Sequence, residues 1–219
     1  MSAPVQTKTQ VVIVEDHPLF RERLALLINK ELDMQVCGET DNIRQAMELI
    51  QSRRPNAAVV DISLKGSSGL ELIKDIKAQS IDLPVLVLSM HDESLYAERV
   101  IRAGAKGYIT KDEASEKVMT AIRKVVAGEI YLSEQMTARV LENLSGKNAG
   151  GSPLERLTDR ELEVFQLIGN GKTAKQIAET LNLGLTTIDT YRARIKEKLN
   201  LKNATELVHE AAEWVRSQR

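Results

Sequence analysis

Four short apolar runs in the first half of the chain each end at a polar residue. VVIV is followed by Glu15 and Asp16, AAVV by Asp61, VLVL by Ser89, and YIT by Lys111. Short runs rich in valine and isoleucine, separated by longer helical stretches, are typical of buried strands in a parallel sheet that is covered on both faces. The carboxyl ends of such strands meet at one edge, where ligands bind. We therefore predict an α/β fold in which these polar side chains converge.

The first predicted domain spans residues 10–128 and consists of five βα units. Strands are expected at 11–14, 34–38, 57–62, 85–88 and 108–110, and helices from Pro18 and at 43–53, 70–79, 94–103 and 115–126. Right-handed crossovers would place helices on both faces of the sheet, and the expected strand order is 2-1-3-4-5. One cysteine, Cys37, falls in the second strand as a small apolar residue.

Residues 129–153 are predicted to connect two domains, since 219 residues exceed a typical single domain. A short helix is expected at 134–144, with Ser133 as its N-cap. The stretch SGKNAGGSP that follows contains three glycines, two serines and a proline, and indicates a flexible linker.

The second predicted domain, residues 154–219, is all-α. Four helices are expected at 159–168, 173–181, 186–199 and 204–215. The connection Asn182–Leu185 contains a glycine and is short enough for a helix-turn-helix. The stretch 185–202 contains five basic residues against two acidic ones, so a basic helix lies in a chain whose net charge is only −1.

Composition argues against a membrane protein. The apolar runs are far shorter than the roughly 20 residues that span a bilayer, and MSAPVQTKTQ lacks the apolar core of a signal peptide. We expect a cytoplasmic protein.

The acidic edge predicts phosphoryl chemistry. Asp16 and Asp61 close neighbouring strands, so they can share one hard cation, for which Mg²⁺ is the natural choice. Ser89 and Lys111 would stabilise transferred phosphoryl oxygens, and an aspartyl phosphate is the expected product. Each residue taken singly has a structural alternative, and Asp16 in particular could simply cap the helix that opens at Pro18.

Residues 10–128 resemble the receiver domain of two-component response regulators, and the whole chain resembles the NarL/FixJ subfamily. The resemblance rests on the polar strand ends and on DISLKGSSGLELIK, and implies a flavodoxin-like fold. It also implies these roles: Asp61 as phosphoacceptor, Glu15 and Asp16 as acidic pocket, the Ser63 carbonyl as a further metal ligand, Ser89 and Tyr108 as switch residues, and Lys111 as the matching lysine. Lys65 and Asp112 replace prolines that are common in the family. Tyr108 could equally be a strand aromatic.

The segment LTDRELEVFQLIGNGKTAKQIAETLNLGLTTIDTYRARIKEKLNL resembles a LuxR-type helix-turn-helix. A helix enters the major groove with its N-terminal residues toward the bases. The expected base contacts are Asp189, Thr190 and Ala193, and the expected phosphate contacts are Lys172, Lys175, Arg192, Arg194, Lys196 and Lys198, although each charge could simply be solvated. Two residues depart from the family pattern: Gly184 stands where a Ser or Thr cap is usual, and Tyr191 replaces a common histidine. The fourth helix of this domain carries an apolar stripe formed by Leu207, Val208, Ala211, Ala212 and Val215. By resemblance to this family the helix supports a homodimer, or the stripe packs on its own domain.

These features together predict a DNA-binding transcription regulator, not an enzyme. A sensor histidine kinase would phosphorylate Asp61, and the phosphorylated homodimer would bind double-stranded DNA. Two other functions fit the sequence. One is a constitutive DNA-binding protein whose first domain only dimerises, and the other is a magnesium-dependent phosphatase acting on small substrates.

Overall fold

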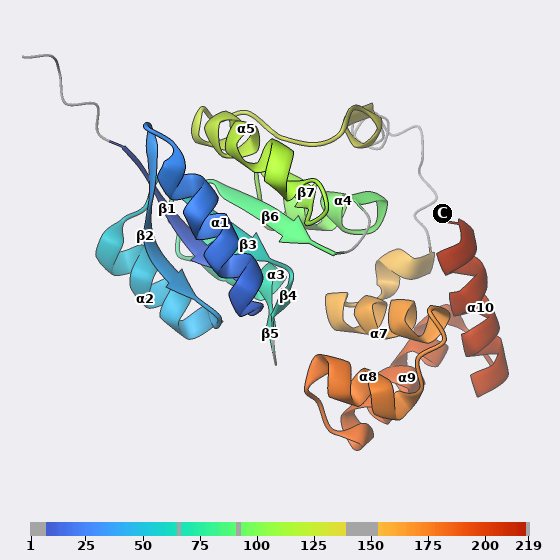
Figure 1. Ribbon diagram of the computed structural model, residues 1–219. Helices are drawn as coiled ribbons and strands as arrows, with labels where there is room; N and C mark the ends of the chain where they lie inside the picture. The colour runs from blue at the N-terminus through green and yellow to red at the C-terminus, as the bar shows by residue number, and fades with distance from the viewer. Residues whose placement is uncertain (1–7, 65–66, 91–92, 139–152, 218–219) are drawn as a thin grey trace, which may run out of the picture. The chain divides into compact units, whose positions relative to one another are not determined.

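The computed structural model describes residues 8–64, 67–90, 93–138 and 153–217, and the chain forms two compact units, 1–140 and 141–219 (Figure 1). Each unit is considered by itself. Within the described residues, each helix is too short or too polar to cross a membrane.

A parallel five-stranded sheet forms the centre of the first unit. Its order is β2-β1-β3-β6-β7, which is the predicted 2-1-3-4-5. The strands are β1 (Thr9–Val14), β2 (Met34–Thr40), β3 (Ala57–Asp61), β6 (Val85–Ser89) and β7 (Gly107–Thr110). All five residues of β3 and of β6 are buried, as expected for central strands covered on both faces. The predicted α/β fold is therefore confirmed.

Five helices cover this sheet, and each follows one of its strands. They are α1 (Pro18–Lys30), α2 (Ile43–Arg53), α3 (Gly69–Ala78), α4 (Glu93–Ala103) and α5 (Ala114–Val126). Helices α1 and α5 share one core with the strands, in which Leu24, Ile28 and Val118 are buried. Helices α2, α3 and α4 follow one another on the opposite face (Figure 1). This layering leaves the carboxyl ends of the strands open for a site.

Two local pairings were not predicted. Directly after β3, the chain forms a small antiparallel pair of β4 (Ser63–Leu64) and β5 (Ser67–Ser68). Beyond α5, Tyr131 makes an isolated parallel bridge with Gly107. Both features place short segments against the end or edge of the sheet.

The predicted connection is described only in part. Residues 134–138 are helical, and the Ser133 hydroxyl accepts a hydrogen bond from the Met136 amide at 3.1 Å, which confirms the N-cap. The rest of the predicted helix and residues 145–152 lie outside the described residues. Pro153, predicted as the end of the linker, instead begins the 3₁₀ helix η1 (Pro153–Arg156).

The described residues of the second unit contain four α-helices, as predicted. They are α7 (Asp159–Gly169), α8 (Ala174–Leu181), α9 (Leu185–Leu199) and α10 (Ala204–Ser217). Capping boxes stop fraying at the start of two of them, between Thr158 and Glu161 for α7 and between Thr173 and Gln176 for α8. Gly184 is the N-cap of α9, so that helix begins one residue earlier than predicted.

Helix α10 closes the core of this unit. Leu207 and Ala211 of its apolar stripe are fully buried, and the ring of Trp214 lies 5.5 Å from that of Phe165. Val208 of the same stripe is 45% exposed. Leu207 and Ala211 therefore pack on their own domain, while Val208 is left on the surface.

Candidate functional site

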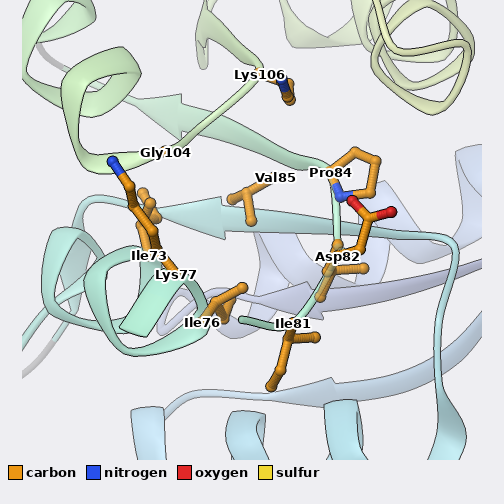
Figure 2. Close-up of a pocket in the computed structure, with 10 residues that line it drawn as sticks. Ile73, Ile76, Lys77, Ile81, Asp82, Pro84, Val85, Gly104 and Lys106 are labelled. Atoms are coloured by element: carbon orange, nitrogen blue, oxygen red, sulfur yellow. The ribbon is translucent and has the colours of Figure 1, made fainter. Parts of the chain in front are cut away.

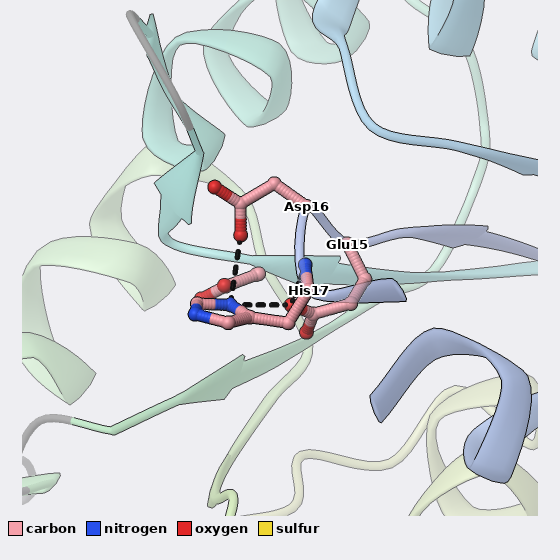
Figure 3. Close-up of side chains that lie close together, drawn as sticks. Glu15, Asp16 and His17 are labelled. Atoms are coloured by element: carbon pink, nitrogen blue, oxygen red, sulfur yellow. Dashed lines mark hydrogen bonds and ion pairs between the residues drawn. The ribbon is translucent and has the colours of Figure 1, made fainter. Parts of the chain in front are cut away.

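The carboxylates predicted to converge do lie together. Glu15, Asp16 and Asp61 are 1%, 6% and 2% exposed at the ends of β1 and β3. One ligand atom from each, together with one from His17, lies within 4.8 Å of all the others. Figure 3 shows His17 turned toward Glu15 and Asp16. Sequence reasoning missed His17, although its position directly after the acidic pair could have indicated it.

Asp16 does not cap helix α1. The N-cap residue of that helix is His17, with Pro18 at the first helical position. The structural alternative for Asp16 is therefore wrong, and its buried carboxylate instead belongs to the acidic cluster at the sheet edge.

The side chain of Lys111 places its ammonium group in this cluster. Its Nζ lies 2.7 Å from Asp61 Oδ2 and within 2.9 Å of both carboxylate oxygens of Glu15. Its amide donates a hydrogen bond to the Ser89 carbonyl at 2.8 Å, and its ammonium lies 4.9 Å from the centre of the Phe20 ring. Within the described residues every peptide bond is trans, so Lys111 reaches Asp61 without a cis bond at Asp112.

Burial and charge oppose each other at this ion pair. Burial and the nearby Glu15 carboxylate raise the pKa of Asp61 to about 7, against the opposing effect of Lys111. Burial lowers the pKa of Lys111, but the carboxylates of Asp61 and Glu15 outweigh it and hold that pKa above its usual value. Within the described residues, three carboxylates face one lysine ammonium at this site, which favours the binding of a further cation.

The backbone around Asp61 is tightly packed. The Ser63 amide donates a hydrogen bond to Asp61 Oδ1 at 3.1 Å, and the Gly69 amide donates one to the Ile62 carbonyl at 2.8 Å. A Cβ atom at Gly69 would lie only 2.0 Å from the Asp61 carbonyl oxygen. The turn after β3 therefore holds the phosphoacceptor candidate in place. Lys65, which replaces a family proline, lies outside the described residues.

Ser89 and Tyr108 are both buried, at 0% and 2% exposed. Ser89 ends β6 beside Lys111, where a hydroxyl was predicted. Tyr108 lies within β7, opposite Val87. Its burial agrees with a strand aromatic, and the switch role stays a prediction.

The oxygen atoms available as metal ligands at this edge suit Mg²⁺. The ion prefers oxygen ligands and is usually bound through one or two carboxylates. Asp16, Asp61 and Glu15 offer carboxylate oxygens within reach of one cation. The residues present therefore fit the predicted cation, with the Ser63 carbonyl as a further candidate ligand.

A separate cavity of about 340 Å³ lies at the other end of the sheet. Its lining includes Ile73, Ile76, Leu83, Pro84, Val85 and Lys106 (Figure 2). Val85 is the first residue of β6, whereas the acidic cluster lies beyond the last residues of the strands. This cavity therefore has no direct part in the chemistry at Asp61.

Helix α9 has the two faces predicted for a recognition helix. Ile188 and Ile195 are fully buried, whereas Asp189, Thr190 and Ala193 are exposed. At 100° per residue, Thr190 and Ala193 lie on the side of α9 opposite the buried isoleucines. The predicted base contacts are therefore accessible.

The predicted phosphate contacts differ in exposure. Lys172, Lys175 and Arg194 are exposed, while Arg192 and Lys196 are partly buried along α9. Arg192 also lies 3.5 Å from Asp189.

Lys198 stands apart from the other basic residues. Its Nζ lies 2.6 Å from a carboxylate oxygen of Glu161, which is 2% exposed and also caps α7. Burial raises the pKa of Glu161, but hydrogen bonds from Lys198 and Thr158 outweigh this effect and lower it overall. Lys198 therefore serves as the counter-ion of a buried carboxylate.

Two family models match the chain. Residues 11–123 match the response regulator receiver domain, and residues 155–211 match the luxR family of bacterial regulatory proteins. The oxygen regulatory protein NreC of Staphylococcus carnosus is 33% identical over 208 residues, covering 92% of this chain and 96% of NreC. The virulence regulator BvgA of Bordetella pertussis, described as a putative positive transcription regulator, is 34% identical over 201 residues, covering 91% and 94%.

Solved structures agree on the fold. RcsB of Salmonella enterica serovar Typhimurium, bound to the promoter P1flhDC with phosphomimetic BeF₃⁻, is similar with a TM-score of 0.57 and 24% identity. The match covers 93% of this chain and 97% of RcsB. The chain belongs to the NarL/FixJ-type response regulators, transcription regulators of two-component systems that join a receiver domain to a LuxR-type DNA-binding domain.

Proposed function

We propose that a sensor histidine kinase phosphorylates Asp61 and that phosphorylation controls DNA binding. The observation that carries this proposal is the contact of Lys111 Nζ with Asp61 Oδ2 at 2.7 Å, inside a cluster of three buried carboxylates. The ammonium would stabilise a phosphoryl oxygen on Asp61, and Ser89 would contact another. We assign these roles to receiver residues 10–128, joined through 129–153 to DNA-binding residues 154–219.

Mg²⁺ would supply the remaining positive charge in this mechanism. Glu15, Asp16, Asp61 and the Ser63 carbonyl would hold it. Bound there, it would reduce the charge repulsion between the Asp61 carboxylate and the incoming phosphoryl group. Asp61 itself acts as the nucleophile, and Lys111 stays in place as a fixed donor.

The DNA-binding half would act through helix α9. Asp189, Thr190 and Ala193 are the proposed base contacts. The proposed phosphate contacts are Lys172, Lys175, Arg192, Arg194 and Lys196. Lys198 was also predicted as a phosphate contact, but it is not proposed because its ammonium pairs with Glu161. We propose that phosphorylation favours a homodimer, which would place two copies of α9 on paired half-sites. Promoter DNA in bacteria lies in the cytoplasm, so this function implies that location.

Intact-protein mass spectrometry after incubation with acetyl phosphate and Mg²⁺ tests the chemistry. We expect one phosphoryl addition in the wild type and none in Asp61→Asn. Asp75→Asn is the matched control, because Asp75 is an exposed carboxylate on α3. The control should be modified like the wild type. Labelling that persists in Asp61→Asn would overturn the assignment.

The two other functions predict different results. A constitutive DNA-binding protein would not be modified by acetyl phosphate or by a kinase, and its DNA affinity would not change. A phosphatase would hydrolyse a phosphomonoester in the absence of Asp61. Light scattering with and without phosphorylation tests the proposed homodimer.

A further inference from the structure

The side chain of His17 lies over the acidic cluster instead of capping its helix. His17 is the N-cap residue of α1 but makes no side-chain cap bond. Its Nδ1 lies 2.9 Å from Asp16 Oδ1 and 3.2 Å from Glu15 Oε1 (Figure 3). Its amide also donates a hydrogen bond to Glu15 Oε1 at 2.9 Å. The His17 imidazole is therefore held next to the carboxylate oxygens that would bind a cation.

These separations also fit ligands of one metal ion. Metal–oxygen and metal–nitrogen bonds of about 2.1 Å put neighbouring ligands of an octahedron about 3.0 Å apart. The two distances from Nδ1 to the carboxylate oxygens of Glu15 and Asp16 match that spacing. A cation between the carboxylates could take Nδ1 as a ligand with little movement of the 67% exposed imidazole.

We infer that His17 is a nitrogen ligand of this cation site, which therefore binds a late divalent transition metal such as Co²⁺ more tightly than Mg²⁺. Imidazole nitrogen suits cobalt, nickel and zinc, whereas Mg²⁺ favours a set of oxygen ligands only. This inference rests on the cation site in the proposed function. It concerns the unphosphorylated protein, so its test does not depend on phosphorylation of Asp61.

The same distances would arise if His17 were only an internal counter-ion. An imidazole whose Nδ1 carries a proton would donate hydrogen bonds to both carboxylates and block a cation from binding between them. Removing it would then strengthen the binding of every divalent ion. Removing a ligand instead weakens the binding of metals that prefer nitrogen and leaves Mg²⁺ nearly unaffected. The two roles predict opposite changes.

Calorimetric titration of the full-length, metal-free protein with CoCl₂ and with MgCl₂ distinguishes these roles. We expect the wild type to bind Co²⁺ at least roughly tenfold more tightly than Mg²⁺. His17→Asn replaces the nitrogen ligand by an amide and should lower Co²⁺ affinity roughly tenfold or more while changing Mg²⁺ affinity less than about threefold. His209→Asn is the control, because His209 is an exposed imidazole on α10. It should leave both affinities unchanged.

A spectroscopic measurement gives a second readout that does not depend on affinities. Co²⁺ is paramagnetic, so a bound imidazole gives strongly shifted proton resonances, which should appear at one equivalent of metal and vanish in His17→Asn. An unchanged ratio of Co²⁺ to Mg²⁺ affinity in His17→Asn, a gain in affinity for both ions, or the absence of shifted imidazole protons would overturn the inference. None of these results would contradict the proposal that Asp61 is phosphorylated.

Discussion

Tyr131 extends the sheet beyond β7 by pairing with Gly107. The Tyr108 amide donates a hydrogen bond to the Tyr131 carbonyl at 2.9 Å, and the Tyr131 amide donates one to the Lys106 carbonyl at 2.9 Å. A Cβ at Gly107 would lie 3.0 Å from the Tyr131 oxygen, so the close approach depends on glycine. The segment after α5 is therefore attached to the strand that carries Tyr108.

Tyr131→Pro should detach this segment from β7. Proline has no amide proton, so the bond to the Lys106 carbonyl is lost. We expect the free energy of unfolding to fall by about 1–2 kcal/mol and the Tyr108 amide to exchange faster with deuterium. Tyr131→Ala is the control, because it keeps both backbone bonds and should preserve Tyr108 protection. Equal protection in the proline variant would contradict the bridge.

The stability of the metal-free protein should depend on pH through Asp61. Because its pKa is raised to about 7, the folded state binds this proton more tightly than the unfolded chain, whose carboxyl pKa is about 3.9. The favourable contribution is thus complete below about pH 4 and lost as the pH rises to about 7. In EDTA, Asp61→Asn should remove this dependence and be more stable than the wild type at pH 8 by on the order of 2 kcal/mol.

Urea unfolding from pH 4 to 8 measures this difference. Asp75→Asn should follow the wild-type curve, since Asp75 is exposed. Saturating Mg²⁺ should stabilise the wild type more than Asp61→Asn, because the variant lacks one carboxylate ligand. A wild-type curve with no decline between pH 4 and 7 would contradict the raised pKa.

Gly69→Ala should disturb the phosphoacceptor. The new Cβ would lie 2.0 Å from the Asp61 carbonyl oxygen and 2.9 Å from Val60 Cγ1, so the backbone must move. We expect a loss of at least about 2 kcal/mol in the free energy of unfolding and slower phosphorylation by acetyl phosphate. Gly38→Ala in β2 is the comparison, because its new methyl group would meet only the flexible end of Leu49, at 3.0 Å. Gly38→Ala should lower the free energy of unfolding by less than Gly69→Ala and leave phosphorylation unchanged.

Lys198→Ala should destabilise the DNA-binding domain by about 1–3 kcal/mol, because it leaves the carboxylate of Glu161 buried without its counter-ion. Because the pKa of Glu161 is lowered in the folded protein, the stabilisation by this ion pair depends on pH. The pair stabilises the fold above the unfolded pKa of about 4.3 and stops doing so as the pH falls through the folded pKa. Thermal unfolding at pH 7 and at pH 3 should therefore show a large difference from the wild type at pH 7 and a small one at pH 3.

Lys196→Ala should weaken DNA binding and leave stability within about 0.5 kcal/mol of the wild type. Affinity should fall for all DNA sequences alike, and the slope of log K against log salt should decrease by about 0.9, corresponding to one phosphate contact. Fluorescence anisotropy at several salt concentrations measures both quantities. An unchanged slope would remove Lys196 from the phosphate contacts.

The sequence by itself determined the fold class and the convergence of Glu15, Asp16, Asp61 and Lys111. These features follow from local patterns, because apolar runs define strands and parallel strands must end at a common edge. The cap of α7 was also predictable, since Thr158 and Glu161 are only three residues apart. Where the signal lies within one element or its cap, the neighbouring residues are sufficient to identify it.

Only the tertiary structure decided which partners distant residues take. Tyr131 reaches Gly107, and Lys198 pairs with Glu161 from 37 residues away. The sequence presents Lys198 as one more basic residue of a recognition helix. It also left Asp16 as a possible helix cap, a position that His17 takes. Such choices depend on the distances between elements after packing, and these are set by the core as a whole rather than by any local pattern.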